Sequence, residues 1–347
     1  MLSITCCVYK LKKSVRAISK SQGAGIVIIA LILASGVIAY EYQNGSRSTT
    51  TLLNAKISLI NLGNNTSPLK LTYDATNRVV YVSNFDNGDI YAINADNNIL
   101  MGTIFSGAVL SSGIAYDPRD NGLYLTGAGN REIVRVDASN SSNVKSAAIS
   151  GRPGDIIYVP SIQKLAVAIG DESTVDEFGT LSNITSAIHV PCPENLAFDD
   201  IQNSIYVSDA CANSVLVFDA VDVKEIGNIS VGFNPIGLAF DSKDGIVFVA
   251  NANSNSVSAI NCSTMKVLST IALGNQSSPV QLAYASRTGE VYVSDQGTDS
   301  ISVINVSTLS VTRTIRVSGS PYGIIYDSDN GKIYAATGTA ITIIPVA

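Results

Sequence analysis

Short apolar runs alternate with polar turns along most of the chain, a pattern typical of β-strands. One such run recurs at intervals of roughly 42 residues, so the chain is internally repetitive. The copies read LKLTYD (69–74), GIAYD (113–117), DIIYV (155–159), NLAFD (195–199), GLAFD (237–241), QLAYA (281–285) and GIIYD (323–327). Six of them follow a proline by one or two residues, and Ser111 takes that place in the second copy. Because proline restricts its own backbone torsion, these prolines define how the chain enters each strand.

A polar turn and a second apolar run follow each copy, which predicts an antiparallel hairpin. The second runs read VVYVSN (79–84), LYLTG (123–127), LAVAIG (165–170), IYVSD (205–209), VFVAN (247–251), VYVSD (291–295) and IYAAT (333–337). Third and fourth strands follow, for example ISVI (301–304) and VTRTIRV (311–317). Seven repeats of four antiparallel strands predict an all-β, seven-bladed β-propeller over residues 55–347.

The last repeat reaches only its third strand, AITIIPV (340–346), which by itself would expose the edge of a sheet. Residues 56–62, KISLINL, precede Pro68 at the distance at which 313–317 precede Pro321. We therefore expect this N-terminal strand to complete the seventh blade and close the ring.

The segment Gly23 to Tyr40 contains 18 residues without a charge, and about 20 are needed to cross a bilayer as a helix. Five basic residues and no acidic one precede it, at Lys10, Lys12, Lys13, Arg16 and Lys20. The positive-inside rule then predicts a cytoplasmic leader (1–22), one N-terminal transmembrane helix acting as signal anchor (23–40), an extracellular linker (41–54) and a propeller outside the cell membrane.

Two other fates of the leader stay open. A cleaved secretory signal also joins basic residues to an apolar run, and Ala34, Ser35 and Gly36 offer the small side chains that cleavage needs. Residues 16–19, RAIS, resemble the pilin-like processing site of archaeal surface proteins. Cleavage after Ala17 at such a site would leave the anchor in place.

The second strands resemble the Tyr-Val-Thr-Asn repeats of YVTN-type propeller proteins, which are frequent on archaeal and bacterial surfaces. Residues 81–84, YVSN, are the best copy, and 206–209, 248–251 and 292–295 are similar. The resemblance covers nearly all of the exterior part and implies a cell-surface propeller, but it is specific for fold more than for function.

Composition agrees with a folded exterior domain, since 46% of residues are hydrophobic and 14% are charged. Apart from the five basic residues of the leader, the chain carries 17 Lys and Arg against 28 Asp and Glu, a net charge of −11. This excess of acidic residues argues against nucleic acid as a partner.

Nine Asn-X-Ser/Thr sequons predict N-glycosylation of the exterior part, several of them in turns after the third strand or around the fourth. They lie at Asn44, Asn64, Asn65, Asn140, Asn183, Asn228, Asn261, Asn275 and Asn305.

The cysteines also fit an exterior location. Cys192 precedes the first strand of the fourth repeat and Cys211 follows its second strand, so both fall on one face of the propeller, and we expect a disulfide between them. Cys262 is left as a buried or half-buried thiol. Cys6 and Cys7 belong to the leader.

Motifs for catalysis are scarce. His189 is the single histidine, and the sequence has no CxxC pair, phosphate-binding glycine loop or HExxH motif. We therefore expect neither an enzyme nor a bound cofactor. An extracytoplasmic lactonase-like hydrolase and an anchored solute-binding protein remain alternatives.

Two groups of polar residues favour a structural explanation. Asp171, Glu172, Asp176 and Glu177 mark an irregular third blade; Asp171, Glu172 and Asp176 are weak calcium candidates, and Glu177 is a candidate ion-pair partner of Arg135. The second group ends the second strands, where such side chains shape turns: Asn84, Asp209, Asn251 and Asp295.

One position at the start of the first strand varies in an informative way. It is glycine in three repeats, at 113, 237 and 323, and polar in the other four, as Lys70, Asp155, Asn195 and Gln281. Four polar side chains around one channel mouth predict a site for a ligand or partner, with binding of channel water as the alternative.

Taken together, these features predict a membrane-anchored, glycosylated surface propeller for recognition of proteins or glycans, adhesion, or envelope or filament assembly. They make no prediction of its oligomeric state.

Overall fold

In the computed structural model, the described residues are 27–33, 36–43, 46–48, 57–179, 181 and 184–346. The chain divides into two units, Met1–Ala55 and Lys56–Ala347. Each unit is considered by itself.

The described part of the first unit is a small antiparallel sheet of β1 (Val27–Leu33), β2 (Gly36–Gln43) and β3 (Ser46–Ser48). The helix expected over residues 23–40 is therefore not what the structure shows there. Apolar runs rich in Val and Ile fit either a strand or a buried helix, and Gly36 begins the second strand after a short break. No helix among the described residues is long and apolar enough to span a membrane. The leader residues and Ala17 lie outside the described residues.

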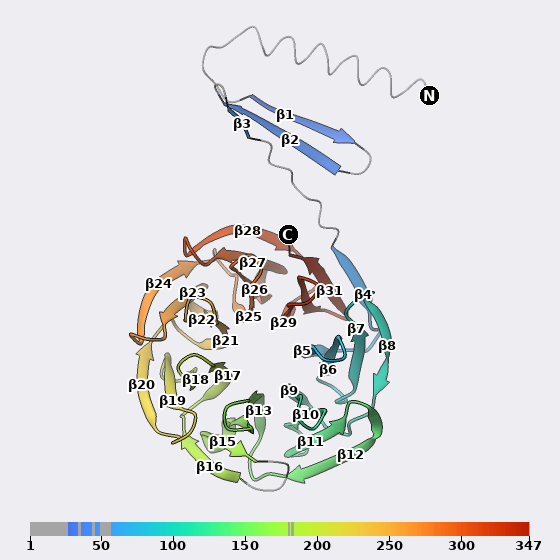
Figure 1. Cartoon of the computed structure of the whole chain (residues 1–347), viewed down its shortest axis with the longest axis vertical. Coiled ribbons are helices and arrows are strands. Elements are labelled where there is room, and N and C mark those ends of the chain that lie inside the picture. The colour runs from blue at the N-terminus through green and yellow to red at the C-terminus, as the bar shows by residue number, and fades with distance from the viewer. Residues whose placement is uncertain are drawn as a thin grey trace. The chain divides into compact units, whose positions relative to one another are not determined.

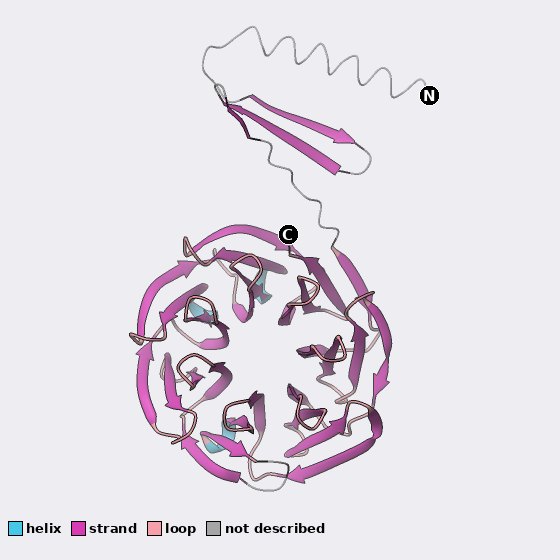
Figure 2. Cartoon of the chain, viewed as in Figure 1, coloured by secondary structure: helices cyan, strands magenta, loops and turns pink. Residues whose placement is uncertain are grey.

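The second unit is a seven-bladed β-propeller, as expected from the repeats, and Figures 1 and 2 show its ring of sheets. Blades 1 to 7 each have four antiparallel strands. The innermost strands, in blade order, are β5 (Pro68–Asp74), β9 (Ser111–Asp117), β13 (Pro153–Val159), β17 (Pro193–Asp199), β21 (Pro235–Asp241), β25 (Pro279–Ala285) and β29 (Pro321–Asp327). The second strands are β6 (Val79–Asn84), β10 (Gly122–Gly127), β14 (Lys164–Ile169), β18 (Ser204–Asp209), β22 (Ile246–Asn251), β26 (Glu290–Asp295) and β30 (Lys332–Thr337).

The two outer strands complete each blade. The third strands are β7 (Ile90–Asn94), β11 (Glu132–Asp137), β15 (Thr174–Phe178), β19 (Ser214–Asp219), β23 (Ser256–Asn261), β27 (Ser300–Asn305) and β31 (Ala340–Pro345). The outermost strands are β8 (Ile99–Ile104), β12 (Asn140–Ala148), β16 (Ile184–His189), β20 (Glu225–Ser230), β24 (Lys266–Ala272), β28 (Ser310–Arg316) and β4 (Ser58–Asn61). Single turns of 3₁₀ helix, η1 (Gly170–Glu172), η2 (Ala252–Ser254) and η3 (Gln296–Thr298), join the second and third strands of blades 3, 5 and 6.

Blade 7 is closed by the N-terminal strand, which confirms the predicted split blade. Strand β4 pairs antiparallel with β31, with Ile60 opposite Ile341 and Asn61 opposite Ala340. Leu62 and Ile60 pack into the apolar cluster that joins blades 7 and 1. The pairing removes the free edge that β31 would otherwise present.

The apolar core lies between blades and not at the ring centre. Second strands such as β6, β18 and β22 are buried along their whole length. Their side chains form clusters that each join two neighbouring blades; one, for example, contains Phe248 of blade 5 and Val291 of blade 6. Each blade is therefore stabilised mainly by its neighbours.

A buried aspartate ends the inner strand in five blades and accepts hydrogen bonds from the turn that follows. Asp74 Oδ1, for example, accepts from the backbone N–H of Thr76 at 2.9 Å, and Asp241 Oδ1 accepts from that of Lys243 at 2.8 Å. A tyrosine of the next blade approaches this carboxylate. Burial and then the charge of Asp241 raise the pKa of Tyr284.

The blade-1 tyrosine makes a related contact with blade 7, but its hydrogen bond goes to the turn after the inner strand and not to Asp327 at the end of that strand. Tyr73 Oη donates to Asp329 Oδ2 of blade 7 at 2.5 Å. In blade 3 the inner strand ends in Val159, and the following blade carries Phe198, which has no hydroxyl to satisfy. In blade 5 the tyrosine position is taken by Phe240, which cannot bond to Asp199 of blade 4. The Asp199 carboxylate lies instead near Tyr206 and Cys262.

Deleting residues 1–62 removes β4 and should lower the free energy of unfolding by about 3–5 kcal/mol, because Ile60 and Leu62 leave their cluster and β31 loses its partner. The control is a chain lacking only residues 1–55, which keeps β4. Thermal unfolding followed by circular dichroism makes the comparison. Equal midpoints for the two chains would contradict a closing role for β4.

Candidate functional site

The inner strands of all seven blades line one cavity of about 350 Å³. Figure 1 shows these strands around the centre of the ring. Its wall contains Lys70, Asp155, Asn195 and Gln281, so the structure brings together all four polar residues singled out from the sequence. They lie at the end of the channel where the inner strands begin. Glu194 and Tyr322 are not among the residues that line the cavity, but the charges of Lys70 and Asp155 act on both, which places them at its rim. These six residues together are called the polar mouth.

The three glycines at the same repeat position have a steric cause. A Cβ added to Gly113 would lie 2.7 Å from the carbonyl oxygen of Gly154 in the next blade. At Gly237 and Gly323 it would collide with the backbone of Val280 and Leu69. Glycine here lets neighbouring inner strands approach closely.

Three of the four polar residues are bound to one another. Lys70 Nζ lies 3.0 Å from Asp155 Oδ1, so this ion pair joins blade 1 to blade 3 past Gly113 of blade 2. Asn195 Nδ2 donates to Asp155 Oδ2 at 2.5 Å. The Asn195 carboxamide oxygen accepts from the backbone N–H of Leu238 at 2.9 Å, which extends the chain of contacts to blade 5.

The ion pair is largely shielded from water, with 13% of the Lys70 side chain and 9% of the Asp155 side chain exposed. Asp155 Oδ2 also accepts from the backbone N–H of Leu196 at 3.1 Å. Such additional hydrogen bonds offset the cost of burying two charges. The network therefore holds the polar mouth in one arrangement.

Gln281 is different. Its side chain is 93% buried and lines the cavity, yet its amide makes no hydrogen bond with a residue that the structure describes. An amide that points into a cavity without a protein partner is available to water or a ligand.

Glu194 and Tyr322 complete the rim and were missed from the sequence. Each stands one residue before the position that varies, where the other blades carry Leu69, Ser112, Gly154, Ile236 and Val280. A Glu and a Tyr at a position that is otherwise apolar or small could have marked these two residues in the sequence.

The environment of Glu194 changes its acidity. Its pKa is raised, first because the protein walls of the channel weaken hydration of the carboxylate and further by the charge of Asp155, while Lys70 acts in the opposite direction. Glu194 remains solvent-exposed. Burial also raises the pKa of Tyr322.

The acidic residues of blade 3 do not gather into a metal site. Asp171 is paired with Arg131 at 3.1 Å, and Glu172 accepts from Ser150 Oγ at 3.0 Å. Asp176 is buried, which raises its pKa. Among the described residues, only Cys192, Asp209 and Cys211 bring three possible ligand atoms within 4.8 Å of one another.

Glu177 pairs with Lys164 at 3.1 Å, whereas Arg135 pairs with Asp120 at 2.8 Å, so both find partners within their own blades. His189 ends the outermost strand β16 and is exposed there. It is not among the residues that line the channel.

The polar residues that end the second strands were expected to shape turns, and only some of them do so. Asp209 Oδ1 accepts from the backbone N–H groups of Cys211 and Ala212, both at 3.1 Å. Asn251 Nδ2 instead donates to Ser256 and Ser258, at 3.3 and 2.9 Å. Asp295 accepts from Ser302 Oγ at 2.5 Å, and its other oxygen has no partner among the described residues.

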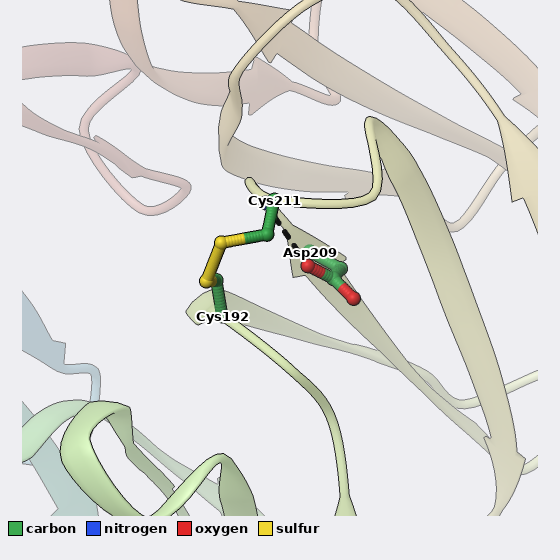
Figure 3. Close-up of side chains that lie close together, drawn as sticks. All are labelled: Cys192, Asp209 and Cys211. Carbon is green, nitrogen blue, oxygen red and sulfur yellow. Dashed lines mark hydrogen bonds between the residues drawn. A yellow bond between two sulfur atoms is a disulfide. The ribbon is translucent and has the colours of Figure 1, made fainter.

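The predicted disulfide is present. Figure 3 shows Cys192 and Cys211 joined beside Asp209, with 5.5 Å between their Cα atoms. Because Pro193 pairs with Asp209 across β17 and β18, the bond lies on the face of the polar mouth. Cys262 is a buried free thiol, and burial raises its pKa to about 12.

The sequons lie at the surface. Asn261 and Asn305 are half-buried, and the described remainder are exposed, namely Asn64, Asn65, Asn140, Asn228 and Asn275. Asn44 and Asn183 lie outside the described residues. The carboxamide oxygens of Asn261 and Asn305 accept from Ser263 and Ser307 of their own sequons, at 2.8 and 2.7 Å. This leaves Nδ2, the atom that carries an N-glycan, free to react.

Neither a family model nor a curated protein matches the chain. Solved structures with a similar fold include catalytically inactive virginiamycin B lyase from Staphylococcus aureus with quinupristin, at a TM-score of 0.74 and 13% identity over 84% of this chain and 99% of that one. Hydrazine synthase from Kuenenia stuttgartiensis is similar at a TM-score of 0.72 and 14% identity, over 82% and 97% of the two chains. These likenesses establish the propeller fold alone, and the YVTN resemblance has no matching family model behind it.

Replacing Asp295 with Asn should stabilise the protein at neutral and alkaline pH. Burial raises the pKa of Asp295 to about 7. Because the folded state holds this proton more tightly than the unfolded state, stability falls as the pH rises from about 4 to 7. Asp295→Asn removes that loss and should add about 2–4 kcal/mol at pH 8, with little change at pH 4.

Blade 5 provides the template and the control, because Asn251, Ser256 and Ser258 occupy the positions of Asp295, Ser300 and Ser302. Asn251→Asp should create the same pH-dependent loss. Unfolding by denaturant at both pH values measures these changes, and a pH-independent effect of Asp295→Asn would refute the explanation.

Replacing Cys192 and Cys211 together by Ser should lower the free energy of unfolding by about 3 kcal/mol, the chain-entropy value for a bond between residues 19 apart. A reductant should bring the wild-type melting temperature down to that of the double variant and leave the variant unchanged. A wild-type midpoint insensitive to both treatments would argue against the bond.

Proposed function

We propose that this protein is a cell-surface recognition module that binds other surface proteins or glycans through its propeller and performs no catalysis. The observation that carries the proposal is the polar mouth, where a fixed network surrounds a cavity with unpaired polar groups. A rigid ring presents these groups without the cost of ordering a loop on binding.

The disulfide and the exposed sequons support a location outside the cell. Disulfides persist in oxidising compartments, and the Cys192–Cys211 bond lies on the same face as the mouth. Asn261 and Asn305 are half-buried, and each accepts a hydrogen bond through its carboxamide oxygen and not through Nδ2, the atom that glycosylation uses.

Attachment to the membrane through residues 23–40 is part of the proposal. It rests on the sequence, where five basic residues precede eighteen uncharged ones. Membership of the YVTN-type surface propellers is likewise proposed on the strength of residues 81–84 and their repeats.

Protease treatment of intact cells that express the full chain should digest or release the propeller, and membranes should retain the untreated protein through an alkaline carbonate wash. A chain lacking residues 1–40 should not be retained. Peptide mapping by mass spectrometry on the same sample reports the leader and the sequons. A propeller that becomes accessible only after lysis would refute the surface location.

A further inference from the structure

The polar mouth contains three groups that the protein itself does not use. These are the Gln281 amide, the Glu194 carboxylate and the Tyr322 hydroxyl, none of which makes a hydrogen bond or ion pair with a described residue. Lys70 adds a fourth group, because its pairing with Asp155 leaves ammonium hydrogens over. A ligand in the mouth would meet both donors and acceptors.

The charges of the mouth oppose one another. Lys70 acts on both Glu194 and Tyr322 and counters the effect of Asp155 on each of them. With one ammonium and two carboxylates, the mouth would repel an anion through Asp155 and Glu194, and a cation attracted by these carboxylates would be repelled by Lys70. A neutral ligand avoids both repulsions.

Hydroxyl groups fit this arrangement because each one can donate and accept. They can donate to the Glu194 carboxylate, accept from Lys70, and do either with the Gln281 amide. The cavity, at about 350 Å³, lies near the lower end of the range for small-molecule sites, which suits a single sugar ring. Tyr322 brings an aromatic ring to the rim, and such rings combine an apolar face with a polar tip.

We infer that the polar mouth binds one monosaccharide unit of a neutral glycan, held by Gln281, Glu194 and Lys70. This inference rests on the proposed recognition function and names its ligand class. The locked network of Asp155 and Asn195 positions these groups and does not itself need to rearrange.

Four neutral sugars test the inference: glucose, galactose, mannose and N-acetylglucosamine. Isothermal titration calorimetry or saturation-transfer NMR with the full chain in detergent should show saturable binding of at least one of them, with a dissociation constant on the order of 1 mM for so small a ligand. Gln281→Ala and Glu194→Ala should each weaken it about tenfold or more.

Matched controls carry the same substitutions away from the mouth. Gln202→Ala, in the turn after β17, and Glu225→Ala, in outer strand β20, replace exposed side chains and should leave binding unchanged. Because the Gln281 amide and the Glu194 carboxylate make no hydrogen bond or ion pair with a described residue, their variants should melt close to the wild-type temperature.

Two results would overturn the inference. One is sugar binding that survives both mouth variants, and the other is failure of all four sugars to bind. Ethanolamine and acetate, run in parallel, show whether a charged ligand takes the site instead. A propeller displayed on intact cells that binds no sugar would refute this inference alone, whereas a sugar-binding propeller found inside the cell would refute the surface location alone.

Discussion

The pairing of β4 with β31 is the constraint on which the rest of the molecule depends. Each blade buries its apolar side chains only against its neighbours, so the core is continuous only when the ring is closed. The seam lies within blade 7, between β31 from the C-terminal end of the chain and β4 from its N-terminal end. Lys70 belongs to β5, the strand that follows β4 in the chain, and its 3.0 Å contact with Asp155 of blade 3 lies inside the ring that this seam closes.

Most of the propeller could be predicted because each repeat contains its own signals. The prolines, the polar turns and the alternating runs all lie within one period. The last repeat contains only three strands, so a fourth had to come from the N-terminal segment before the first repeat. Residues 27–40 show the limit, since an uncharged run rich in Val and Ile satisfies a helix and a strand equally well. The contact between Tyr73 and Asp329 was also out of reach, because it joins residues 256 positions apart that belong to different blades.

Four of the six residues of the polar mouth were predicted from the sequence, but the contacts between them were not. Comparing repeats identified Lys70, Asp155, Asn195 and Gln281, because a fixed position that changes from glycine to polar is visible in the sequence alone. Which of them bind one another depends on distances across the ring, and three became a network while Gln281 stayed unpaired. Glu194 and Tyr322 were missed because they stand one position earlier in the repeat than the position that alternates between glycine and polar residues.

A ring of near-identical blades offers no binding specificity until the repeat is broken. At the start of the inner strand, glycine in three blades lets neighbouring strands approach closely. Polar residues at this position in the other four blades fill the remaining space. The irregular order of the two kinds around the ring therefore sets the shape of the mouth. Departures from local consistency in an otherwise regular fold mark places where stability was not the only requirement. By that criterion, a carboxylate at Glu194 and an unpaired amide at Gln281 are the least structural features of the channel. They are accordingly where recognition chemistry is to be sought.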